Sequence, residues 1–239
     1  TCYYPNPQIN ALAPAYCQNE PSVTLSGSAT LGGPPGGAAI GTGTFTVNGT
    51  PATVFDPSVV GAGTHTVVYT FDAADGVPNA SHPGCIQSVS QSVVVNPVPT
   101  ANAVASATYC PGASVPASNF SGTPSGVTFS WTRTAGAIGL APLSGNGNVP
   151  SFVATNGGAT PISSTFTVTP SYTNAGKTCT GTPVNYTITI NPTPTVNAQT
   201  NKTYCSSTST GGITFTGNAT KYNWTNTNTA IGLAANGTA

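Results

Sequence analysis

The chain has 239 residues, and only four are basic and four acidic, so its net charge is zero. An ordinary domain carries roughly 25% charged residues, so Thr, Ser, Asn and Gly must supply the polar surface here. The absence of a basic patch argues against nucleic acid and anionic lipid as partners, and no apolar run approaches the roughly 20 residues of a membrane-spanning helix. We therefore expect an extracellular protein without nucleic-acid binding or direct membrane insertion.

Short strands are predicted along the chain, because apolar and polar residues alternate with a period of two. In chain order, the alternation appears in Val67, Tyr69 and Phe71, in Val89, Val93 and Val95, in Val127, Phe129 and Trp131, and in Tyr186, Ile188 and Ile190. The 28 Gly and 22 Pro residues interrupt the sequence too often for long helices. The predicted fold class is all-β, with half-buried antiparallel strands packed as β-sandwiches.

Two landmarks recur along the chain. Tyr-Cys pairs begin at Tyr16, Tyr109 and Tyr204, which are 93 and 95 residues apart, and Asn-Pro-x-Pro-Thr segments occupy 96–100 and 191–195. A unit of about 95 residues is the size of one sandwich domain, and the Pro-rich segments are predicted to be semi-rigid linkers. The predicted organisation is the end of a preceding unit or linker (1–10), two sandwiches (11–98 and 99–194) and a partial third repeat (195–239).

The third repeat is recognised by Trp224-Thr225 and the Ala-Ile-Gly-Leu-Ala sequence of residues 230–234, which reproduce Trp131-Thr132 and residues 137–141. Both tryptophans are predicted to be core anchors, since aromatic side chains dominate core burial. This repeat lacks its later strands, and a half-built sheet exposes unpaired edges. We expect either that the natural chain continues or that another chain completes the sheet, so the predicted partners are copies of the repeat or neighbouring domains.

Six cysteines and few charges fit an oxidising compartment. Each complete repeat has one Cys after its Tyr and one before its last strand. The last strand of the first repeat spans about 33 Å at the rise of a strand and leads to the next repeat. Cys85 is therefore predicted to lie at the pole where its own domain begins, beside Cys17. A Cys85–Cys110 bond would have to cross the length of a domain, which exceeds the Cα separation of a disulfide. The predicted disulfides are therefore Cys17–Cys85 and Cys110–Cys179.

Two cysteines remain. Cys205 opens the partial repeat, so its partner is expected after Ala239. Cys2 is out of register, because it precedes Asn6 by four residues whereas Cys85 precedes Asn96 by eleven. Cys2 is expected to pair upstream, with Cys17, or with another subunit. The lack of a Cys-x-x-Cys motif or a nearby His disfavours a metal or redox-active site.

Residues that carry catalysis are scarce. Residues 83–239 contain no Asp, Glu or His, so the usual groups for acid–base catalysis are missing there, and Lys177 is expected to lack the acid that isopeptide chemistry needs. His65 is predicted to be a packed structural residue. Asp72 and Asp75 offer a weak Ca²⁺ candidate, but a hairpin turn ending in Asp-Gly is the favoured interpretation. No cofactor and no enzymatic activity are predicted.

The motifs of the second repeat support a resemblance to a known family. Trp131-Thr132, Ile138-Gly139-Leu140, Pro150-Ser151-Phe152, the Cys-Thr-Gly-Thr-Pro sequence of residues 179–183 and residues 191–194 resemble the PKD-like repeats of large Bacteroidota surface proteins. The first repeat, with Gly63-Thr64-His65-Thr66-Val67 and Tyr69, is similar to the Ig-like repeats that accompany them, although its loop from Gly32 to Gly37 departs from the pattern. The resemblance implies type IX secretion, often to the cell surface, in gliding adhesins and other giant repeat proteins, and it implies no activity for a single repeat.

The predicted function is a structural segment of an extracellular surface protein, such as a stalk, a filament or an adhesin spacer. The alternative is a carbohydrate-binding or adhesive module that contacts surface glycans through exposed Tyr and Asn residues. The loops considered for that role are Tyr3-Tyr4 and Asn223 to Asn228.

Overall fold

The computed structural model describes residues 5–31, 37, 39–73 and 86–239. The chain divides into two compact units, one formed by residues 1–102, 120–130 and 168–184, and the other by 103–119, 131–167 and 185–239. The described residues contain only one short α-helix, α1 (Pro57–Val60), and one 3-10 helix, η3 (Thr229–Ile231). Neither is long and apolar enough to cross a membrane.

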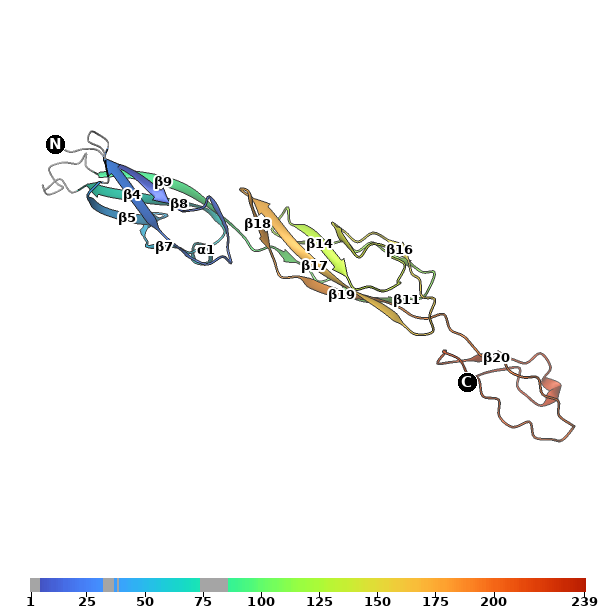
Figure 1. Cartoon of the computed structure of the whole chain (residues 1–239). Coiled ribbons are helices and arrows are strands. Elements are labelled where there is room, and N and C mark those ends of the chain that lie inside the picture. The colour runs from blue at the N-terminus through green and yellow to red at the C-terminus, as the bar shows by residue number, and fades with distance from the viewer. Residues whose placement is uncertain (1–4, 32–36, 38, 74–85) are drawn as a thin grey trace. The chain divides into compact units, whose positions relative to one another are not determined.

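A five-stranded sheet contains most of the strands predicted in the first repeat (Figure 1). Its order is β2 (Ala15–Cys17), β9 (Ile86–Asn96), β8 (Gly63–Ala73), β5 (Gly41–Val47) and β6 (Thr50–Pro51). All neighbours are antiparallel except β2 and β9, which run parallel, with Tyr16 opposite Val95 and Cys17 opposite Asn96. This parallel pair sets the position of Cys17.

Two strand pairs form the opposing layer: β1 (Pro5–Asn10) with β4 (Ser26–Leu31), and β3 (Val23–Thr24) with β7 (Val54–Phe55). Phe55 packs against Val67, Val93 and Val95 of the five-stranded sheet, and Ala29 packs against its other end. Residues 1–10 are predicted to be the end of a preceding unit or a linker, but Pro5–Asn10 forms strand β1, which pairs with β4 of the first repeat. Prolines are tolerated in an edge strand of this kind, because an edge needs fewer backbone donors.

A six-stranded sheet repeats this plan. It contains β11 (Ala107–Tyr109), β19 (Val184–Ile190), β17 (Ile162–Asn174), β14 (Thr128–Arg133) and β15 (Ser144–Asn146) in that order, with β18 (Lys177–Thr180) paired to β17. Strands β11 and β19 again run parallel. Trp131 is 3% exposed, and its ring lies 5.9 Å from that of Phe166, which stacks on Tyr186. The prediction that Trp131 is a core anchor is confirmed.

Four short strands pair beside this sheet, β10 (Thr100–Ala101) with β13 (Gly122–Thr123) and β12 (Ser114–Val115) with β16 (Phe152–Val153). Both sheets place their last long strand between the preceding long strand and a short strand that runs parallel to it, and separate two-stranded pairs lie outside each sheet. This is the strand arrangement of an immunoglobulin-like sandwich. The all-β, Ig-like fold class is confirmed.

Residues 195–239 contain a smaller set of strands. β20 (Asn223–Thr225) pairs with β21 (Asn236–Thr238), and Val196 forms an isolated bridge with Gly217. Trp224 is half-buried and its ring lies against Gly237, as the ring of Trp131 lies against Gly145. The internal repeat seen in the sequence is therefore also a repeat of local packing.

The Ala-Ile-Gly-Leu motif forms a loop fixed by a buried arginine. Arg133 is 9% exposed and donates to the carbonyl oxygens of Pro142, Gly136, Thr134 and Leu140 and to the Ser164 hydroxyl. Burial lowers the pKa of its guanidinium. In the third repeat, Asn226 stands at the corresponding position and donates to the Leu233 carbonyl. A polar side chain at equivalent positions therefore closes this loop in both repeats, and only that of Arg133 is buried.

Candidate functional site

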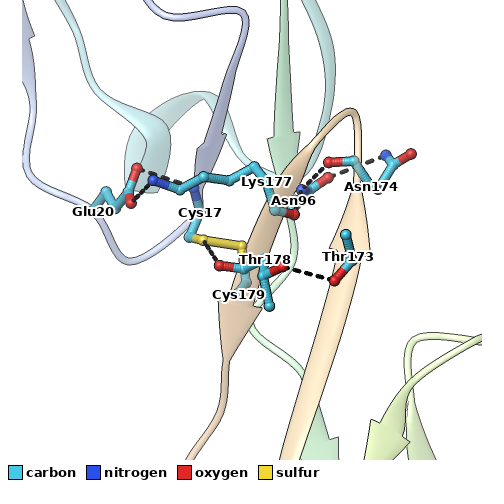
Figure 2. Close-up of a disulfide and its surroundings, with 8 residues drawn as sticks. All are labelled: Cys17, Glu20, Asn96, Thr173, Asn174, Lys177, Thr178 and Cys179. Atoms are coloured by element: carbon cyan, nitrogen blue, oxygen red, sulfur yellow. Dashed lines mark hydrogen bonds and ion pairs between the residues drawn. A yellow bond between two sulfur atoms is a disulfide. The ribbon is translucent and has the colours of Figure 1, made fainter.

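The two cysteines joined in the described residues come from different sequence repeats. Cys17 is bonded to Cys179 with a Cα–Cα distance of 5.6 Å (Figure 2). The predicted Cys17–Cys85 and Cys110–Cys179 disulfides are therefore wrong. Cys110 and Cys205 are free, exposed thiols, and Cys2 and Cys85 lie outside the described residues.

The direction of β2 explains this pairing. Because β2 runs parallel to β9, Cys17 lies opposite Asn96, the last residue of β9. Ile86, the first residue of β9, is ten residues away, or about 33 Å along a strand. Cys17 was predicted to lie beside the start of the last strand, whereas it lies beside its end. A disulfide allows a Cα separation of only about 4.4–6.8 Å.

Cys179 is carried by a tight hairpin. Strands β17 and β18 pair Asn174 with Lys177 and Tyr172 with Cys179. The two residues between them, Ala175 and Gly176, have φ values of 50° and 75°, as a two-residue type I′ turn requires. The sequence signal for this turn is Gly176, which readily adopts positive φ.

The side chain of Asn96 binds the tip of this hairpin. In the sequence, Asn96 is predicted only to be the first residue of a linker. Its side chain is 0% exposed. It donates to the carbonyl oxygens of Asn174 (2.9 Å) and Lys177 (3.1 Å), and its Oδ1 accepts from the Asn174 amide (3.1 Å; Figure 2). Asn96 thus satisfies the turn's backbone acceptors, which would otherwise lose hydration without compensation.

An ion pair lies on the other side of the disulfide. Lys177 Nζ is 2.5 Å from Glu20 Oε1, and Glu20 Oε2 accepts from the backbone N–H of Cys17 at 3.3 Å (Figure 2). The expectation that Lys177 lacks an acid is therefore wrong, because Glu20 comes from the other sequence repeat. The two side chains are 38% and 30% exposed, so solvent screens their attraction and the pair contributes little to stability.

We define the junction as Cys17, Glu20, Asn96, Asn174, Lys177 and Cys179. Cys17 is 5% and Cys179 1% exposed, so the disulfide is shielded from solvent reductants. The junction contains one disulfide bond, three hydrogen bonds made by asparagine side-chain amides, and one ion pair. This chemistry fixes one segment of chain to another.

The remaining predicted site residues lie elsewhere. His65 is 8% exposed, and its ring nitrogens meet Asn48 Nδ2 and the Gly61 carbonyl, each at 2.9 Å, which confirms a packed structural histidine. Asp72 lies within β8, opposite Thr42 and Ile86, and Asp75 lies outside the described residues. Within the residues that the structure describes, no group of three His, Cys, Asp or Glu side chains lies close enough to hold a metal ion.

The loop proposed for glycan contact is tied to itself. Asn226 donates to Leu233 O and accepts from the Asn228 backbone, and Asn228 accepts from the Ala230 backbone. Tyr3 and Tyr4 lie outside the described residues. These two asparagine side chains therefore already have intramolecular partners.

No protein-family model and no curated protein matches the chain. Among solved structures, it is similar to the extracellular domain of protocadherin gammaB4, with 13% identity over 84% of this chain and 36% of that one and a TM-score of 0.35. An I-band fragment of titin shows 14% identity over 78% and 65%, with a TM-score of 0.34, and mouse cadherin-23 shows 11% over 79% and 67%, with a TM-score of 0.30. The chain spans about a third to two thirds of the length of these proteins.

The strand order and the junction define the class of protein on their own. The chain consists of tandem Ig-like β-sandwich repeats, and a disulfide connects two successive sequence repeats.

Proposed function

We propose that this chain is a non-enzymatic structural segment of an extracellular surface protein, in which the repeats act as a spacer. The observation that carries the proposal is the Cys17–Cys179 disulfide. This bond restrains two successive repeats relative to each other, and catalysis within one domain would not require such a restraint. A stalk or filament does need such restraint, since it must keep its distal part at a defined distance.

Two properties of the chain support an extracellular location. Disulfides of this kind persist in oxidising compartments, and the junction cysteines are almost fully buried. The polar surface is built from uncharged residues, with only eight formal charges in 239 residues. Together with the motifs of residues 131–194, these properties favour a segment of a large, type IX secreted Bacteroidota surface protein with PKD-like and Ig-like repeats.

The spacer role is tested by measuring how far the junction restrains the repeats. Fluorescent non-natural amino acids at Thr50 and Ser144, which leave all six cysteines intact, report the distance between the two repeats in single molecules. The oxidised chain is expected to give one narrow distance distribution, and Cys17→Ser/Cys179→Ser a broader one. Equal widths in the two proteins would show that the disulfide restrains nothing.

The adhesive alternative is tested by glycan binding. We expect no binding on a glycan array, because Asn226 and Asn228 of the loop Asn223 to Asn228 already make hydrogen bonds within the loop region. Reproducible binding that is lost in Asn226→Ala or Asn228→Ala, with the fold intact, would replace the spacer role by an adhesive one.

A further inference from the structure

The free cysteine of the second repeat occupies the same local structure as the bonded cysteine of the first. Tyr16 lies opposite Val95 in the parallel pair β2–β9, and Tyr109 lies opposite Ile190 in the parallel pair β11–β19. The chain then turns in the same way, since the Glu20 N–H donates to the Cys17 carbonyl. The Ala113 N–H likewise donates to the Cys110 carbonyl.

The asparagine that receives the hairpin is also repeated. Asn96 ends the last strand of the first repeat, and Asn191 directly follows Ile190, the last residue of β19. The Asn191 N–H donates to the Tyr109 carbonyl at 2.9 Å, which holds it beside Cys110 in the sheet. The cysteine and the asparagine that contact the hairpin in the first repeat therefore both have counterparts in the second.

The two sites differ in exposure. Cys17 and Asn96 are 5% and 0% exposed, with the β17–β18 hairpin seated on them. Cys110 and Asn191 are both exposed. An amide and a thiol at equivalent positions thus form a complete binding site in one repeat and an uncovered one in the other.

We propose that Cys110 and Asn191 receive the β-hairpin of a further repeat and that Cys110 forms a disulfide with the cysteine in the second strand of that hairpin, the equivalent of Cys179 in β18. The polarity comes from the observed junction, in which the hairpin belongs to the repeat that follows in sequence. Ala113 replaces Glu20, so this second junction has no counterpart of the Lys177–Glu20 ion pair and depends on Asn191. The inference does not require the spacer role, because an adhesin would use the same connection.

Disulfide formation removes two electrons and two protons from the two thiols. In a glutathione buffer, oxidised glutathione accepts them and becomes two molecules of reduced glutathione, while one Sγ–Sγ bond forms. The position of this equilibrium measures how well the hairpin is held against Cys110.

The test uses the full chain with a second copy of residues 99–194 inserted between residues 194 and 195. The inserted copy carries Thr180→Ser, which marks its hairpin peptide by mass, and Cys110→Ser, so that the original Cys110 alone yields the Cys110 peptide. Pepsin is used for non-reducing peptide mapping, because Arg133 is the first basic residue and trypsin would leave four cysteines in one peptide. We expect Cys110 linked to the marked hairpin and Cys17 still linked to the original Cys179. Asn191→Ala is expected to lower the equilibrium constant of the new bond at least tenfold.

A folded inserted repeat with Cys110 still open to alkylation would overturn the proposal, and so would a Cys110 bond to another molecule. Folding of the insert is checked from the fluorescence of its own tryptophan in a variant in which the original Trp131 and Trp224 are replaced by Phe. If it does not fold, the chain of 239 residues is treated with a peptide of residues 168–182 whose cysteine carries a 2-thiopyridyl group. The Cys110 thiolate attacks the peptide sulfur, the peptide–thiopyridyl bond breaks, and 2-thiopyridone leaves with the electron pair. Reaction at Cys110 at least tenfold faster than with a scrambled peptide is expected, and equal rates would refute the proposal.

Discussion

Substitution of Asn96 by Ala tests whether its side chain seats the β17–β18 hairpin. The change removes two donated hydrogen bonds and one accepted bond from a side chain that is fully buried. At about 1 kcal/mol for each neutral bond, the junction should lose about 3 kcal/mol, which corresponds to roughly a hundredfold in an equilibrium constant. Asn191→Ala is the matched control, because it changes the same motif at an exposed position.

The assay is the equilibrium of the Cys17–Cys179 disulfide with glutathione, approached from the oxidised and the reduced protein. Asn96→Ala should shift this equilibrium toward the thiols by roughly a hundredfold, whereas Asn191→Ala should shift it less than twofold. If both variants shift it equally, or if Asn96→Ala shifts it less than threefold, the hydrogen bonds of Asn96 do not hold the hairpin and the reasoning is refuted.

Three further substitutions probe the loop and the junction. Arg133→Met should destabilise the second repeat by about 3 kcal/mol in urea unfolding, because it leaves several carbonyl groups without their buried donor; a loss below 1 kcal/mol would contradict this role. Gly139→Ala should lower the free energy of unfolding more than Gly147→Ala. Both glycines have positive φ, but only the alanine Cβ at position 139 would collide with a facing carbonyl oxygen, so equal losses of stability would contradict the collision. Glu20→Gln should shift the equilibrium of the Cys17–Cys179 disulfide with glutathione toward the thiols by less than about 1 kcal/mol, and by less again at 1 M salt. A larger shift that does not depend on salt would show that solvent does not screen the ion pair.

The fold class was predictable because its signals are local. Alternation in Val67, Tyr69 and Phe71 defines which face of the strand is buried, and all three side chains are buried in the structure. The spacing of the Tyr-Cys pairs likewise identified the repeat, since each repeat carries its own copy of the local pattern.

The disulfide was not predictable by the same reasoning. Strand β2 has only three residues, and a period of two indicates which face is buried but not which strand is the neighbour or in which direction it runs. The partner of Tyr16 is Val95, far away in sequence. An assumption about strand direction therefore decided the pairing, and that assumption was wrong.

The roles of Asn96 and Glu20 were missed for a related reason. Asn96 precedes a proline, so its position in a linker motif explained its presence without any contact. Its partners Asn174 and Lys177 lie 78 and 81 residues away, and no local pattern connects them. The recurrence of the asparagine at Asn191 was the one available signal, because a linker needs the prolines but not a particular amide before them.

The geometry of the sandwich determines which cysteines can pair in an array of such repeats. A first strand that runs parallel to the last ends at the same pole as the last strand, so Cys17 lies beside Asn96, at the exit to the next repeat. Ile86, the first residue of the last strand of the first repeat, lies ten residues from Asn96, or about 33 Å along the strand, which no disulfide spans. The same parallel pairing holds for β11 and β19. In the first repeat the Tyr-Cys cysteine therefore lies at the end of the last strand, where it bonds to the hairpin of the repeat that follows.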